Sequence, residues 1–175
     1  VAIGAIGAAT VFAMQEVIAS IAGWIALSFG NFFKPGDRVE LGGIKGDVID
    51  IGLLRSTLME IGAWSHGDQY SGRMVRVANS FVFKQPVFNY SSEFPFLWDE
   101  IQMSLRLGSD IDRAKDIVLK AAESQVGDYT ARSESSWKHV AQRFLIEAAQ
   151  LAPMATIALT DGSIVCTVRY IVDYK

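Results

Sequence analysis

The pattern of apolar positions changes sharply after the first thirty-three residues. Residues 1–33 contain a single charged side chain, Glu16, and their apolar positions run almost without a break. Residues 1–15 have no proline and no turn cluster, and small residues recur four positions apart, as at Gly4 and Ala8. Small residues let membrane helices approach closely, because lipid supplies no hydrophobic drive between them. The pattern predicts a membrane helix, with a buried helix of a soluble core as the alternative.

A second apolar run follows the polar pair Gln15 and Glu16. Residues 17–33 carry their aromatic side chains toward the end and are followed by Lys34. Aromatic and basic residues together are typical of a segment that reaches the cytoplasmic membrane surface. Fifteen helical residues rise only about 22 Å, against about 30 Å for a hydrocarbon core, so the first run needs residues upstream of this sequence to span. We expect residues 1–33 to form a transmembrane helix and an interfacial helix.

Turn residues and β-forming residues replace the apolar run over residues 34–92. Val, Ile and Leu alternate with turn residues such as Pro35-Gly36-Asp37 and Gly42-Gly43, which predicts short strands continuing to about residue 83. Residues 61–72 are polar and rich in glycine, which is typical of an exposed hairpin loop. The pattern predicts a small all-β domain, built as a sheet or a barrel.

Residues 93–175 mix strand and helix patterns. A strand near residue 100 precedes a helix that Ser109 or Asp110 can cap, and a second helix is predicted over residues 136–152. Two β-runs then flank Asp161-Gly162, a strong hairpin signal. The order strand, helix, helix, strand, strand predicts an α+β domain of the ferredoxin-like type.

The distribution of charge supports this division. All 16 Lys and Arg residues lie at or after Lys34, although the chain as a whole has a net charge of −3 and is 50% hydrophobic. A membrane-type segment joined to a soluble part fits that asymmetry. The first residue is Val, and no basic residue precedes the apolar run, so we expect the interior of a longer protein rather than a signal peptide. A single cysteine, Cys166, permits no internal disulfide and fits a reducing compartment.

No set of residues in the sequence forms a candidate active site. His66 and His139 fall in different predicted domains, and Cys166 lies in a predicted strand, which disfavours a Cys/His pair. The glycine-rich stretch GGIKG lacks the Gly-Lys-Ser/Thr end of a phosphate-binding loop. Asp110 and Asp112 have an ordinary capping role, and the scattered basic residues disfavour nucleic-acid binding. We therefore expect no enzyme activity, no cofactor, no metal site and no nucleic-acid partner.

Two stretches of the chain resemble the small-conductance mechanosensitive channel family, the MscS type. The first contains the segments GAATVFAMQEVIASIAGW and FFKPGDRVELGGIKGDVIDIGLLRSTLM, where the family has a Gly/Ala pore helix, a Gln, an interfacial helix, a Pro-Gly-Asp junction and a glycine-rich strand. The second is RVANSFVFKQPVFNYS, which is similar to the family's strand ending in an Asn-containing turn. The resemblance covers essentially the whole chain.

The resemblance implies a homo-oligomeric channel of seven identical subunits in the plasma or inner membrane. One helix from each subunit would line the pore, and membrane tension would open it to pass ions and small solutes after hypo-osmotic shock. The β domain and the α+β domain would form a hollow cytoplasmic vestibule below a multi-pass membrane part in contact with lipids. A further helix and a short strand would follow Lys175.

The resemblance also assigns roles to residues of the first helix. Those that would face the pore are Gly4, Ala8 and Phe12, those that would pack against neighbouring helices are Ala5, Gly7, Ala9 and Val11, and those at the hinge or interface are Gln15, Glu16 and Gly23. A ring of Phe12 side chains would narrow and dry the pore, since hydrophobic constrictions block ions by dewetting. Glu16 stands where the family's type case has a hinge glycine, so both Gly23 and the Gln15-Glu16 junction are candidates for the bend.

A membrane-anchored scaffold or receptor is the alternative function. Its cytoplasmic domain would bind a ligand or partner, and the apolar helix would serve as an anchor only. A passive anchor is normally dominated by Leu, Ile and Val rather than by the Gly and Ala found here. The composition therefore favours the channel.

Overall fold

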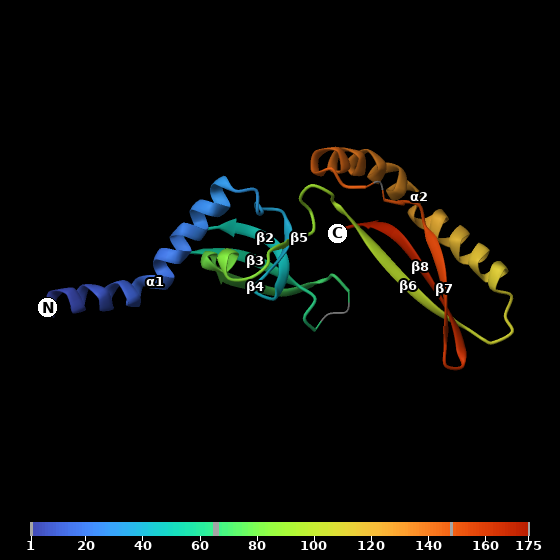
Figure 1. The fold of residues 1–175 in the computed structure, drawn as a ribbon, viewed down its shortest axis with the longest axis horizontal. Coiled ribbons are helices and arrows are strands. Elements are labelled where there is room, and N and C mark those ends of the chain that lie inside the picture. The colour runs from blue at the N-terminus through green and yellow to red at the C-terminus, as the bar shows by residue number, and fades with distance from the viewer. Residues whose placement is uncertain (1, 65–66, 148, 175) are drawn as a thin grey trace. The chain divides into compact units, whose positions relative to one another are not determined.

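A computed structural model describes the chain except for residues 1, 65–66, 148 and 175, and except for the side chains of residues 2–6, 8 and 9. The chain forms two units, Val1–Ser92 and Glu93–Lys175, each with its own secondary structure (Figure 1). In the described part of the first unit a long helix, α1 (Ala2–Phe29), precedes five strands and a short 3-10 helix. The described part of the second unit contains three strands and one helix.

The five strands of the first unit form one antiparallel sheet in the order β4-β3-β2-β1-β5. They are β1 (Arg38–Leu41), β2 (Ile44–Ile51), β3 (Arg55–Ile61), β4 (Tyr70–Ala78) and β5 (Phe88–Asn89). Gly42 and Gly43 join β1 to β2 with φ values of +62° and +76°, as a two-residue hairpin turn with two positive φ angles requires. Fully buried Leu41 and Leu58 centre the core of this unit. The sheet confirms the small β domain expected from the sequence.

The strand predicted to continue to about residue 83 ends earlier. After Ala78 the chain forms a 3-10 helix, η1 (Asn79–Phe83), so the extended prediction is wrong over these five residues. The cause is the fully buried side chain of Asn79, whose Nδ2 donates hydrogen bonds to the carbonyl oxygens of Gly52 at 2.8 Å and Leu53 at 3.2 Å. Its Oδ1 accepts a hydrogen bond from Ser56 Oγ at 2.8 Å. These bonds to a distant turn divert the chain from the sheet.

Charged side chains attach the loop between β3 and β4 to strands β1 and β2. Arg38 is only 4% exposed, and its Nε lies 2.7 Å from Asp47 Oδ1, which raises the pKa of the guanidinium. Asp68, near the end of the hairpin loop, pairs with Lys45 at 2.9 Å and with Arg38 at 3.7 Å. On the hairpin itself, hydrogen bonds from Ser71 and Arg73 lower the pKa of Glu60. The strands reach Ile61 and Tyr70, so the loop is shorter than the predicted range 61–72.

The second unit has a three-stranded antiparallel sheet and one long helix. The strand order is β6-β8-β7, with β6 (Phe96–Leu105), β7 (Met154–Thr160) and β8 (Ser163–Asp173), and the helix is α2 (Ile111–Phe144). The hairpin at Asp161-Gly162 is confirmed, with Gly162 at a φ of +90°. The cap is also confirmed, because Asp110 Oδ1 accepts a hydrogen bond from the backbone N–H of Arg113 at 2.9 Å. The unit is α+β, as expected.

The prediction of two separate helices in this unit is wrong, since α2 is a single helix of 34 residues. The polar stretch in its middle has no proline, and its hydroxyl groups bond back to the helix, as Ser133 Oγ does to the carbonyl of Thr130 at 2.8 Å. The helix also ends before the predicted residue 152, at Phe144, and the next residue, Leu145, is left-handed with a φ of 54°. The described residues thus contain one of the two helices of a ferredoxin-like arrangement.

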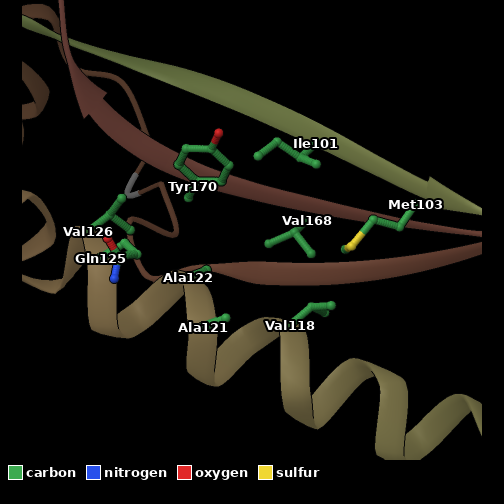
Figure 2. A pocket seen from close by; sticks show the side chains of 9 residues that line it. All are labelled: Ile101, Met103, Val118, Ala121, Ala122, Gln125, Val126, Val168 and Tyr170. Atoms are coloured by element: carbon green, nitrogen blue, oxygen red, sulfur yellow. The ribbon is translucent and has the colours of Figure 1, made fainter.

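An open apolar groove of about 400 Å³ lies between α2 and one face of the sheet (Figure 2). Ile101 and Met103 of β6 and Val168 of β8 face alanines and valines of α2 across it. Tyr170 lies at one end, where its hydroxyl donates a hydrogen bond to Asp99 Oδ2 at 2.8 Å. Burial raises the pKa of Tyr170 to about 12. The helix α2 therefore covers only part of the apolar face of this sheet.

The core of the first unit makes a prediction about stability. Leu58 has no exposed surface, whereas Leu53 is 52% exposed on a turn. Leu58→Ala should destabilise the protein by about 2–5 kcal/mol, because it removes buried methyl groups and leaves a cavity. Leu53→Ala is the matched control and should stay within about 0.5 kcal/mol of the wild type. Urea unfolding checks this, and equal losses for the two variants would contradict it.

Candidate functional site

Helix α1 runs without interruption from Ala2 to Phe29, although its axis changes direction partway along (Figure 1). Of residues 1–33, expected to form a transmembrane helix and an interfacial helix, Ala2–Phe29 belong to one continuous helix, and residues 30–33 lie after its end. Neither Gln15, Glu16 nor Gly23 interrupts it, because none of these residue types removes a backbone hydrogen bond as proline does. Over Thr10–Phe29 the described helix is apolar and long enough to cross a membrane.

One face of α1 is docked on the β domain. Glu16, Ser20, Gly23 and Leu27 follow one another at spacings of four, three and four, which places them on one side of a helix. Ser20 and Leu27 are only 3% and 4% exposed, and Leu27 belongs to the core of the β domain. This set of four residues is called the docking face below.

The closest approach on the docking face is at Gly23. A Cβ atom at this position would lie 2.3 Å from the carbonyl oxygen of Asn79 and 3.0 Å from the backbone nitrogen of Ser80. No side chain fits in that space without a shift of backbone, so α1 and η1 can meet here only through glycine. Gly23, expected as a possible hinge, thus lies in a tight contact within a continuous helix.

Glu16 forms the polar end of the docking face. One carboxylate oxygen, Oε1, accepts a hydrogen bond from Ser80 Oγ, and the other, Oε2, lies 2.5 Å from Lys84 Nζ. These partners are 64 and 68 residues away along the chain. The side chains of Glu16 and Lys84 are 57% and 47% exposed, so water reaches the ion pair. The single charge in the apolar run is therefore paired with the β domain.

The other face of α1 has no contact with the rest of the described chain that would cover its apolar side chains. Phe12 is 77% exposed and Val11 62%, and a shallow groove of about 410 Å³ runs along this face. The residues that line the groove are Val11, Phe12, Gln15, Ile18, Ala19 and Ala22. This face, called the open face below, exposes large apolar side chains next to one another, as surfaces that contact protein or membrane do.

Some of the predicted site residues lie on the open face or the docking face, and the side chains of the others are not described. The side chains of Ala5, Ala8 and Ala9, and the surroundings of Gly4, lie outside the described residues. Gly7, Val11, Phe12 and Gln15 are exposed, whereas Glu16 and Gly23 belong to the docking face.

Five residues of the contact were not expected from the sequence, namely Ser20, Leu27, Asn79, Ser80 and Lys84. The spacing of small and polar residues after Glu16 was a usable signal for Ser20. No local pattern marked the partners on η1, because their role depends on a contact between segments far apart in the sequence.

The described residues offer no metal centre, since no group of three or more His, Cys, Asp or Glu side chains lies close enough together among them. Cys166 is a free, buried thiol in β8. The candidate functional site is therefore formed by the two faces of α1.

Sequence comparison connects this geometry with ion channels. Residues 16–92 match the family model described as the mechanosensitive ion channel β-domain. An uncharacterized MscS family protein of Archaeoglobus fulgidus is 29% identical over 123 residues, covering 70% of this chain and 40% of that protein. Another from Synechocystis is 31% identical over 88 residues, covering 49% of this chain and 27% of that protein. The mitochondrial mechanosensitive ion channel protein 1 of Arabidopsis thaliana is 25% identical over 113 residues, covering 60% of this chain and 21% of that protein.

Structural comparison extends the likeness to the whole fold. The closed-state crystal structure of Helicobacter pylori MscS matches with a TM-score of 0.64 at 23% identity, covering 99% of this chain and 57% of that chain. The cryo-EM structure of Arabidopsis thaliana MSL1 matches with a TM-score of 0.65 at 17% identity, covering 98% and 53%. The fold is that of a mechanosensitive channel subunit.

Within that class, residues 16–92 match the β-domain of the mechanosensitive channels, and the relatives and solved structures named above include proteins of the MscS type, which the sequence motifs also resemble. It spans about two fifths of the length of the archaeal relative.

Two glycine-to-alanine variants distinguish the effect of the tight contact at Gly23 from the effect of helix propensity. Gly23→Ala should weaken the attachment of α1 to η1, because the new methyl group would meet backbone at 2.3 Å. Gly127→Ala in α2 is the matched control, since a Cβ there meets nothing within 4 Å. Propensity alone would favour alanine by up to about 1 kcal/mol at either site. Hydrogen exchange of the η1 amides checks this, and equal protection in both variants would argue against a tight contact.

Proposed function

We propose that the chain is part of a mechanosensitive ion channel that opens under membrane tension and releases ions and small solutes after hypo-osmotic shock. The observation that carries this proposal is the division of α1 into a docking face on a channel-type β domain and an apolar open face. A helix attached in this way contacts the β domain directly, through Gly23 and Leu27. Tension on the membrane part would therefore act directly on the β domain.

The open face of α1 supports a homo-oligomeric pore, for which we propose seven subunits. Val11 and Phe12 are uncovered in the single chain, so neighbouring helices or the pore must surround them in the membrane. In this proposal the pore is lined by Gly4, Ala8 and Phe12, and the helices pack through Ala5, Gly7, Ala9 and Val11. Phe12, the bulkiest of the proposed pore-lining side chains, would form the hydrophobic constriction.

The bend of α1 is best placed at the Gln15-Glu16 junction. Gly23 is held against the backbone of η1 and has no room to change its packing. Glu16 is bonded to Ser80 and Lys84, whereas Phe12 and Gln15 on its N-terminal side are exposed, which supports a bend at this point. Movement of the pore segment relative to the β domain would therefore concentrate around Gln15 and Glu16.

The position of Glu16 also sets the proposed depth of the helix in the membrane. A charge at the centre of a bilayer costs several kcal/mol, and the cost falls toward the interface. Because Glu16 pairs with Lys84 of the β domain, both belong near the cytoplasmic headgroups. We place the β domain and the α+β unit in the cytoplasm and the upstream part in the plasma or inner membrane, as a multi-pass protein in contact with lipids. The family is one of ion channels rather than enzymes.

Current recording tests the proposed function directly. The full-length protein, purified and reconstituted in lipid vesicles, should give currents that appear when suction is applied to a membrane patch. A membrane-anchored scaffold or receptor would give none, because its helix only attaches the soluble domain to the membrane. Absence of tension-dependent current in patches that contain the protein would reject the channel.

The constriction makes a second prediction. Phe12→Ser should hydrate the narrow part of the pore, raising current at rest and lowering the tension threshold, because a hydrophobic constriction blocks ions by dewetting. Phe29→Ser at the other end of α1 is the matched control, since Phe29 is also exposed, at 86%, but lies outside the proposed pore segment. The measurement is resting current and threshold in patches. An unchanged threshold and closed-state leak in Phe12→Ser would remove Phe12 from the constriction.

A further inference from the structure

We propose that the ion pair between Glu16 and Lys84, together with Ser80, is a latch whose strength depends on ionic strength and that fixes α1 to the β domain. The latch makes Ser80 and Lys84 positioning residues for gating. Its role in gating rests on the proposed channel function, whereas its effect on the attachment of α1 does not.

The latch occupies the end of the attached part of α1. Ser20, Gly23 and Leu27 are buried on the β domain, whereas Phe12 and Gln15, on the N-terminal side of Glu16, are exposed. Glu16 is thus the last point at which a described contact holds the helix before it leaves the β domain. Loosening this point would lengthen the free part of the helix by one turn, to Ser20.

The three partners have unequal responses to salt. The Glu16 and Lys84 side chains are 57% and 47% exposed, so dissolved ions can screen their attraction. The screening length falls from about 30 Å at 0.01 M salt to about 3 Å at 1 M. The Ser80 hydroxyl is neutral and buried, so its hydrogen bond alone would persist at high salt. The charged part of the latch therefore weakens as ionic strength rises.

No second charge within α1 competes for these groups, because Glu16 is the only ionised side chain of the helix. Lys84 Nζ also lies 5.7 Å from the centre of the Phe81 ring, which helps to hold the ammonium group beside the end of η1. The charged part of this attachment thus consists of one charge from each side. Water entry dilutes the ions around the β domain, so the latch tightens under the osmotic conditions in which the channel would open.

Hydrogen exchange tests the latch in the full-length protein in lipid vesicles. In the wild type, raising salt from about 0.01 M to about 1 M should speed exchange of the η1 amides and of residues 16–27 on the order of two- to fivefold, as expected for an exposed ion pair. Glu16→Gln retains an oxygen for Ser80 but removes the charge, so its exchange should be fast at low salt and insensitive to salt. Lys84→Gln should behave in the same way.

A double variant with the two charges swapped and a matched control variant complete the hydrogen-exchange experiment. Glu16→Lys combined with Lys84→Glu should restore the salt dependence, because the attraction is restored with opposite polarity. Lys120→Gln removes an exposed ion pair with Asp116 on α2 and should leave exchange at η1 as in the wild type. Unchanged exchange of the β1–β3 amides in each variant verifies that the β domain is folded.

Two sets of outcomes separate this proposal from the channel function. Salt-independent exchange at η1 in the wild type, or full salt dependence in Glu16→Gln, would overturn the latch. In patches, the tension threshold of the wild type should depend on salt and that of Glu16→Gln should not; equal dependence in both would remove the latch from gating while leaving the channel intact. Absence of any tension-dependent current would reject the channel, and the exchange data would still decide whether the latch exists.

Discussion

The position of the membrane-type helix depends on the close contact between Gly23 and the backbone of Asn79. There is no space for a side chain between them, so the two segments are held at a fixed separation. Asn79 is itself fixed by hydrogen bonds to the turn between β2 and β3 and to Ser56. The placement of α1 is therefore set by the sheet, through one buried amide side chain and one glycine.

The polar residues of the apolar run follow from the same contact. A helix surrounded by lipid alone would exclude a carboxylate, because an unpaired charge in an apolar medium is costly. Glu16 is tolerated since Ser80 and Lys84 provide partners from the β domain. Ser20 is buried on the same face, whereas Gln15 lies on the open face. Gln15 and Glu16 thus lie on different faces of the same helix. Gln15 is on the open face, and Glu16 is on the face that contacts the β domain.

Ion pairs within the β domain link its strands to its hairpin loop. Arg38 is buried with Asp47, and Asp68 from the hairpin loop joins them through Arg38 and Lys45. Removing one member of such a buried pair leaves an uncompensated charge, so the network constrains the loop as well as the strands. In the proposed channel, a support of this kind would pass a force applied to α1 on to the sheet.

The sequence by itself determined the features that depend on near neighbours. The apolar helix, the Gly42-Gly43 and Asp161-Gly162 turns and the Asp110 cap are all set by residues within a few positions, so local patterns predicted them. Turn residues and β-forming residues also predicted the β domain, and the family motifs connected it with a channel. Local patterns failed at Asn79–Phe83, where an amide bonded to a distant turn converts an expected strand into a 3-10 helix.

Only the tertiary structure decided which residues hold α1 in place. Gly23 is a packing residue because η1 lies against it, and Glu16 is a paired residue because Lys84, 68 positions away, lies beside it. Hydrophobic periodicity records whether a face is buried but not which segment buries it, since that choice depends on the path of the whole chain. For this reason the sequence left the bend open between Gly23 and the Gln15-Glu16 junction, and the contact with η1 favours the latter.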